Sequence, residues 1–142
     1  MAYPMKPITI TASATLDRDV HAGTTTNLSA AAGLTVTLPA SAGTGDEYEL
    51  FVATTVSSNS YIVQVANATD IIQGTLAVTT DAAGVVVPTA STSDTITMNG
   101  STTGGVKGSR IVLKDVSSGV WAVSGGLVST GTEATPFSAA VS

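Results

Sequence analysis

Cysteine is absent from the 142-residue chain, which excludes disulfide bonds and thiolate metal sites. Charged side chains are scarce, at 11% of the residues, and the net charge is −5. The cations are too few to neutralise a phosphate backbone, so we expect no direct nucleic-acid binding; they are Lys6, Arg18, Lys107, Arg110 and Lys114. The chain has no apolar run of membrane-spanning length, and its start lacks the apolar core of a signal peptide. We therefore expect no membrane partner, and synthesis in a cytoplasm.

Small and hydroxylated residues are abundant instead. Ser and Thr account for 40 residues and Ala for 20, whereas aromatic residues make up only 4%. Low charge combined with a substantial apolar fraction is the opposite of the composition of disordered chains, and the length fits one domain. A surface with so few charges also differs from that of a freely dispersed monomer. This composition favours a protein that works in contact with other protein.

Apolar and polar residues alternate with a period of two along most of the chain, as in short strands bounded by Gly, Asn, Asp or Ser. The pattern predicts an all-β fold: a single antiparallel β-sandwich or jelly-roll-like domain of about eight to ten short strands. The expected strands are Ile8–Ala14, Thr24–Leu28, Leu34–Leu38, Tyr48–Ala53, Tyr61–Ala66, Ile71–Val78, Gly84–Val87, Thr95–Met98, Arg110–Lys114 and Val120–Ser124. No fixed repeat period indicates a solenoid.

Local signals add turns but no helix. The segment Asp115–Gly119 predicts a hairpin, because Gly supplies the positive φ that a short loop needs. Asn99–Gly100 predicts a second turn. The Ala run in Ser29–Gly33 is too short for a stable helix and is interpreted as a turn.

The two ends of the chain differ from its body. Pro4 and Pro7 each remove a backbone donor, so residues 1–7 are predicted to form an extended arm. Residues 8–126 form the β domain, and residues 127–142 form a loose C-terminal tail in which Phe137 is an apolar anchor. We expect the arm and tail to contact neighbouring proteins, and the candidate interface residues are Ala2, Tyr3, Pro4, Met5, Pro7 and Phe137.

No group of residues predicts catalysis, so we expect a protein that is not an enzyme, with no cofactor and no metal. His21 is the sole histidine, has Asp17 and Asp19 nearby, and is interpreted as a surface or interface residue. The acids at 17, 19, 46, 47 and 49 lack the spacing of a calcium loop. Gly104–Gly108 lacks the full phosphate-loop spacing. Trp121 is interpreted as a core residue, with a sugar-stacking platform as the alternative.

Three segments together carry a resemblance: "AAAGLTVTLPASAGTGDEYELFV", "SSNSYIVQVANATDIIQG" and "GSRIVLKDVSSGVWAVSGG". Over about residues 8–126 the chain resembles small capsid decoration, or cement, proteins of tailed bacteriophages. The resemblance implies an all-β protein that binds the outer surface of an assembled capsid and clamps neighbouring major capsid subunits. Its expected partners are the major capsid protein and copies of itself, as trimers or dimers. Its expected location is the virion.

Two other classes stay open. The first is a phage tail, fibre or baseplate module, which could bind carbohydrate, and the second is a β-sandwich enzyme or lectin. A sugar platform requires exposed aromatic side chains, so the exposure of Trp121 and Tyr61 distinguishes the first alternative. Strand addition by Ala2–Pro7 or Leu127–Ser142 at a neighbour's sheet edge is a hypothesis for how the protein attaches.

Overall fold

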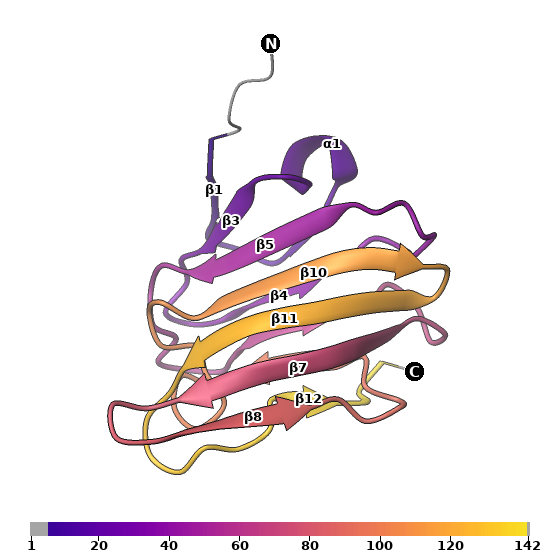
Figure 1. Ribbon diagram of the computed structural model, residues 1–142. Coiled ribbons are helices and arrows are strands. Elements are labelled where there is room, and N and C mark those ends of the chain that lie inside the picture. Colours follow the sequence, from indigo (N-terminus) through magenta and orange to yellow (C-terminus); the bar gives the residue numbers. More distant parts are fainter. Residues whose placement is uncertain (1–5, 142) are drawn as a thin grey trace.

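Two β-sheets pack face to face in the computed structural model, which describes residues 6–141 (Figure 1). The seven-stranded sheet has the order β1 (Ile8–Ile10), β3 (Thr25–Leu28), β5 (Glu47–Val52), β10 (Arg110–Ser117), β11 (Val120–Val128), β7 (Ile71–Thr79) and β8 (Gly84–Pro88). The five-stranded sheet has the order β12 (Phe137–Ser138), β9 (Thr95–Met98), β6 (Tyr61–Gln64), β4 (Leu34–Thr37) and β2 (Ala14–Thr15). The all-β expectation is confirmed, and β2 and β12 are too short to give a periodic signal.

The core lies between the sheets and follows directly from the alternation. In β5, Tyr48, Leu50 and Val52 are buried while the residues between them are partly exposed. The same pattern in β4 and β6 fills the core from the opposite side. Burying each such side chain contributes about 1.5 to 3 kcal/mol relative to leaving it in water. The largest fully buried side chains are Trp121, Tyr48, Tyr61, Leu28, Leu38, Leu50, Ile72, Leu76, Ile96, Met98, Ile111 and Leu113.

The sheets are mixed, so the expectation of an antiparallel sandwich is wrong, and the jelly-roll order is not confirmed. Five of the ten strand pairings within residues 6–141 are parallel: β1–β3, β3–β5, β2–β4, β4–β6 and β7–β11. The physical reason is the path of the chain. The first six strands alternate between the two sheets, so each strand from β3 to β6 runs in the same direction as the strand two before it in strand order, which accounts for four of the five parallel pairs.

This path makes the N-terminal half a coil of two turns with unequal lengths. In the seven-stranded sheet Ile8 is opposite Thr26, and Thr26 is opposite Leu50, so equivalent positions are 18 and 24 residues apart. In the five-stranded sheet Ala14, Val36 and Val63 are opposite one another, at intervals of 22 and 27 residues. Because the intervals differ, the coil leaves no fixed period in the sequence.

The predicted turns are confirmed. Ser117 is opposite Val120 across the β10–β11 hairpin, and Gly119 has φ +84°. Gly100 has φ +80° and begins the loop that follows β9. The Ala run is a turn in which the Gly33 N–H donates to the Ala30 carbonyl at 2.8 Å.

The sequence analysis missed one short helix, α1 (Arg18–His21), in which the Asp19 N–H group donates to the side chain of the N-cap residue Asp17. At four residues it is too short to show a helical period. Within the described residues no helix is long and apolar enough to cross a membrane.

The C-terminal segment is paired with the domain, in contrast to the loose tail expected from the sequence. β11 continues to Val128, and Leu127 is fully buried. In β12 Phe137 pairs with Ile96, and the Asp94 carboxylate accepts from the N–H groups of Ala140 and Val141. The composition of the segment did not indicate these contacts, because most of them are made by backbone groups, which every residue type carries. The segment is therefore part of the sandwich.

Candidate interaction surfaces

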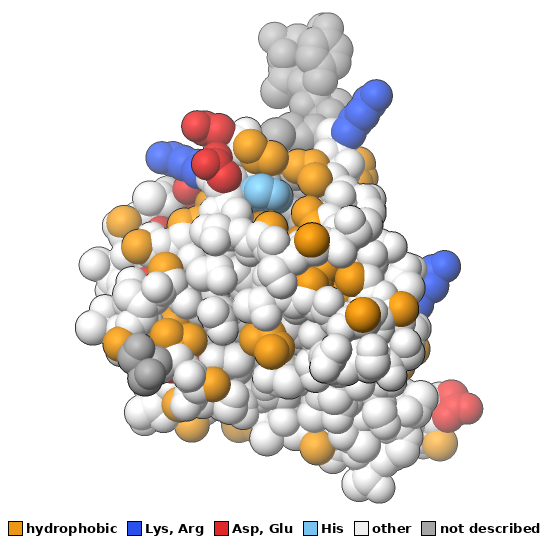
Figure 2. Space-filling model, turned by 180° about the vertical axis from the view of Figure 1, so that it is seen from behind, with side chains coloured by type: hydrophobic (Ala, Val, Ile, Leu, Met, Phe, Trp, Pro, Cys, Tyr) orange, Lys and Arg blue, Asp and Glu red, His pale blue; other side chains and the backbone are white. Residues whose placement is uncertain are grey.

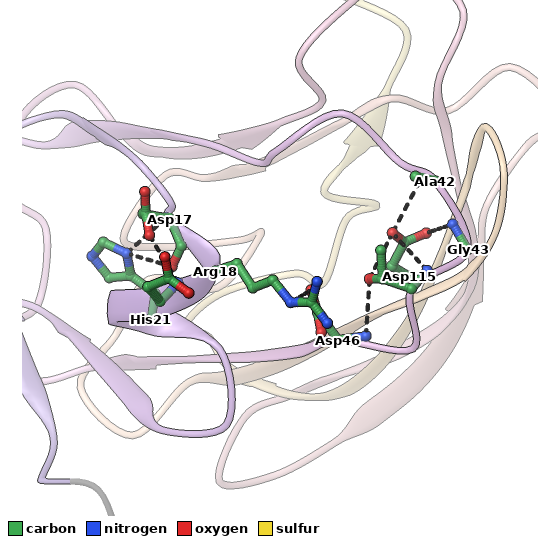
Figure 3. A network of polar contacts seen from close by, with 9 residues as sticks. Asp17, Arg18, His21, Ala42, Gly43, Asp46 and Asp115 are labelled. Carbon is green, nitrogen blue, oxygen red and sulfur yellow. Dashed lines mark hydrogen bonds and ion pairs between the residues drawn. The ribbon is translucent and has the colours of Figure 1, made fainter.

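The His21 side chain is hydrogen-bonded to the backbone in this structure. Its Nδ1 accepts a hydrogen bond from the Asp17 N–H at 2.8 Å, which closes the start of α1 (Figure 3). The residue is only 9% exposed, so it is largely buried and not a freely exposed surface side chain, while its role as an interface residue stays a prediction. The helix folds the ring back against the chain, which a lone histidine in a polar segment does not reveal.

Asp115 is the most heavily hydrogen-bonded carboxylate in the described chain, and it organises the loop between β4 and β5. Its side chain accepts from the N–H groups of Ala42 and Gly43 (Figure 3). It also accepts from the N–H group of Thr44 and from the hydroxyl groups of Ser41 and Thr44. Burial by itself raises the pKa of Asp115, but these hydrogen bonds outweigh burial and lower the pKa to about 2. Every donor belongs to the loop itself, so the cluster has a structural role.

The other acids that sequence analysis considered are dispersed. Asp46 forms an ion pair with Arg18 at 3.0 Å, and Glu49 forms one with Arg110 at 2.6 Å. Hydrogen bonds from Arg110 and Thr25 lower the pKa of Glu49. Across residues 6–141 no group of three His, Cys, Asp or Glu side chains has the arrangement of a metal site.

Trp121 and Tyr61 lie in the core, with exposed fractions of 1% and 0%. Trp121 contacts the Tyr48 ring edge to face, with ring centroids 5.7 Å apart, and the Tyr61 hydroxyl donates to the Thr54 carbonyl. Neither side chain can stack on a sugar. The core interpretation of Trp121 is confirmed, and the carbohydrate-binding alternative loses its expected platform.

The outer side of the five-stranded sheet is an uncharged surface, which we call the threonine face. It consists of the outward positions Thr15, Thr35, Thr37, Ile62, Gln64 and Thr97, which lie opposite one another across β2, β4, β6 and β9. Figure 2 shows the molecule from this side, with uncharged polar groups over most of the surface and charged groups near its margin. An uncharged sheet surface suits contact with another protein better than binding of an ionic ligand.

The edge of the seven-stranded sheet at β8 is the second notable surface. Val86 is 63% exposed, Val85 is 43% exposed, and both belong to a strand with a neighbour on one side only. Beside this strand an open groove of about 300 Å³ is lined mainly by apolar groups, including Val87, Pro88 and Phe137. The sequence contained the signal, an uncharged Gly-Val-Val-Val-Pro run, but could not show that the run lies at an edge.

The predicted interface residues have different locations. Ala2, Tyr3, Pro4 and Met5 lie outside the described residues, and Pro7 is exposed. Phe137 is half-buried against the core of its own domain and also lines the groove beside β8. Of the predicted residues, Phe137 therefore lies at the groove beside β8.

Comparisons with known proteins add nothing to these observations, since no family model, no curated protein and no solved structure matches the chain.

Proposed function

We propose that the chain is a structural virion protein that binds the outer surface of an assembled tailed-phage capsid and clamps neighbouring major capsid subunits. The proposal rests on the sequence resemblance to capsid decoration proteins. The structural observation that supports it best is the threonine face, the outer side of the five-stranded sheet, whose outward positions carry no charged side chains. The partners are the major capsid protein and other copies of this chain, as trimers or dimers.

Such a protein gains affinity by repetition. Once one contact on a shell has formed, each further contact by a linked copy becomes effectively intramolecular, and overall binding can exceed the single-site affinity by about 10² to 10⁴. A broad face of small side chains offers many modest contacts of this kind. A rigid two-sheet body keeps them in a fixed arrangement.

The test is binding to assembled heads. Purified protein is mixed with emptied, expanded heads of the phage that encodes the chain, and bound protein is measured by sedimentation with the heads and by electron microscopy. The expected result is saturation at a fixed ratio to the major capsid protein and density on the outer surface. No binding to expanded heads, or binding to a host surface glycan instead, would contradict the proposal.

A pair of substitutions locates the contact. Ile62→Asp places a charge at the centre of the threonine face, and Val112→Asp is the matched change on the outer side of the other sheet, where Val112 is also half-buried. Burying an unpaired charge is costly, so Ile62→Asp should weaken head binding at least about tenfold, while Val112→Asp should leave it unchanged. The reverse result would assign the contact to the seven-stranded sheet.

A further inference from the structure

The four edge strands of the sandwich differ in length. β1 has three residues, while β2 and β12 have two each, and such short edges offer little backbone for pairing. β8 has five residues, and it carries Val86, the most exposed large apolar residue of the described chain. A longer apolar edge strand is a template for another strand. β8 is therefore the edge strand best suited to pair with an added strand.

The register of β7 and β8 shows which backbone groups are free. The Thr80 N–H donates to the Ala83 carbonyl, and the Thr89 N–H donates to the Gly74 carbonyl. In an antiparallel pair, hydrogen-bonded and non-hydrogen-bonded positions alternate, so residues 85 and 87 also bond toward β7. Gly84 and Val86 then direct both their N–H and C=O groups away from the sheet. They form two donor–acceptor pairs, two residues apart, on the open side.

We propose that this edge binds residues Ala2–Met5 of a second copy of the chain as an added antiparallel strand. This segment has no charged side chain, and neither has the β8 run from Ala82 to Ser93. Tyr3 and Met5 are two residues apart, so their backbone groups match those of Val86 and Gly84. Pro4, which has no N–H, then faces away from β8 and leaves no hydrogen bond unmade.

The side chains fit the same arrangement. Directly opposite residues of an antiparallel pair lie on the same side of the sheet, so Tyr3 and Met5 cover exposed Val86 on the outer side. Pro4 lies on the other side, over the groove lined by Val87 and Phe137. Both the apolar edge and the apolar groove are then covered by one segment.

The segment must come from another copy, because a chain cannot reach its own β8. β1 and β8 are the two outer strands of a seven-stranded sheet, at its top and bottom in Figure 1. Six spacings of about 4.8 Å separate them by about 29 Å. Met5 is three residues before Ile8, which permits at most about 11 Å.

Pairing of β8 with the β8 of a second copy is less favourable. In an antiparallel pairing centred on Val86, each Pro88 would lie opposite the Gly84 of the other copy. Proline has no N–H, so one hydrogen bond would be lost at each end of the pairing. The N-terminal segment causes no such loss.

The first experiment measures self-association of the full chain by sedimentation velocity over a range of concentrations, without capsids. Val86→Lys should weaken self-association at least about tenfold, because lysine disfavours pairing at an edge. Val116→Lys is the matched control, since Val116 is 48% exposed in β10, away from this edge. Thermal unfolding verifies that both variants fold. A wild-type chain that stays monomeric throughout, or an equal effect of both substitutions, would overturn the proposal.

The second experiment uses the absence of native cysteine. A chain with Tyr3→Cys is mixed with a chain with Val86→Cys and treated with a short bis-maleimide linker. The expected product is a mixed dimer, with far less product when Val116→Cys replaces Val86→Cys. Predominant linkage between two Val86→Cys chains would show β8–β8 pairing and refute the proposal. Because no capsid is present, either failure bears on the pairing between copies and not on the proposed binding to the capsid.

Discussion

At the scale of single residues, the carboxylate of Asp115 holds a loop that is distant in sequence, a role that its position in the sequence does not indicate. It lies at 2% exposure and accepts hydrogen bonds from three successive backbone N–H groups, at Ala42, Gly43 and Thr44. Those donors come from a loop more than 70 residues earlier in the chain. The residue joins the β4–β5 connection to the β10–β11 hairpin.

Asp115 should make the protein sensitive to acid. Its pKa is about 2 in the folded protein, below the ordinary 3.8, so the unfolded chain binds the proton more readily. The resulting stability, about 2 kcal/mol, is fully present above about pH 5 and is lost as the pH falls toward 2. Urea unfolding between pH 7 and pH 2 measures it. Asp115→Asn should remove this part of the pH dependence and lower stability at pH 7.

The control for this prediction is Asp81→Asn, at an exposed position that makes none of these contacts. It should change stability by no more than about 0.5 kcal/mol. An unchanged pH profile in Asp115→Asn would show that other carboxylates control the acid response.

Two adjacent glycines in β11, Gly125 and Gly126, differ in whether the structure has room for a Cβ atom. Gly125 has φ +137°, and a Cβ atom there would lie 2.2 Å from the Arg110 carbonyl oxygen, whereas a Cβ at Gly126 would meet nothing within 4 Å. Gly125→Ala should therefore cost at least about 2 kcal/mol. Gly126→Ala should be neutral or slightly stabilising. Chemical denaturation of both variants measures the difference, and equal effects would contradict the backbone argument.

At the scale of the elements, β12 is held by both backbone and side-chain contacts. Phe137→Ala should cost about 1 to 3 kcal/mol, because Phe137 packs against the core of its own domain. Phe51 is the other phenylalanine of the chain and lies on the outer side of β5, so Phe51→Ala is the control and should cost less. Thermal unfolding compares them. A loss for Phe137→Ala no larger than the loss for Phe51→Ala would contradict this expectation.

The strands themselves were largely predictable from sequence. The alternation located β4, β6, β7 and β9 to within two residues, because one face of each strand is buried and the other meets solvent. The alternation did not predict β2, β12 and α1, because each has only two to four residues, too few for a periodic pattern. The docking of the C-terminal segment was not predicted either, since the Asp94 contacts to it are long-range.

At the scale of the whole molecule, pairing and direction could not be predicted. Alternation shows which face of a strand is buried, but β4 and β6 would read identically whether parallel or antiparallel. The connections of five to nine residues between β3, β4, β5 and β6 permit either a hairpin or a crossing to the other sheet. The interaction surfaces were equally hidden, because the exposure of Val86 depends on β8 being last in its sheet.

The coil also determines how the protein should fold. The first six strands pair with strands two or more elements away, and not with their immediate neighbours in sequence. Non-local pairing requires loop closure first, so refolding should take milliseconds to seconds, as in other sheet proteins. Fluorescence of Trp121, the sole tryptophan and a buried one, measures the rate in stopped-flow experiments. Completion within microseconds would contradict this expectation.

The winding of the N-terminal half has a further consequence for sequence change within this protein. Each turn of the coil contributes one strand to each sheet, and the first turn supplies the edge strands β1 and β2. A further turn added at these two edges would leave the hairpins at the other end of the seven-stranded sheet unchanged. Insertion of about twenty residues with the same alternation, just before Ile8, would widen both layers together and preserve the existing core. The architecture can thus gain or lose length at one end by a whole unit, without redesign of the rest.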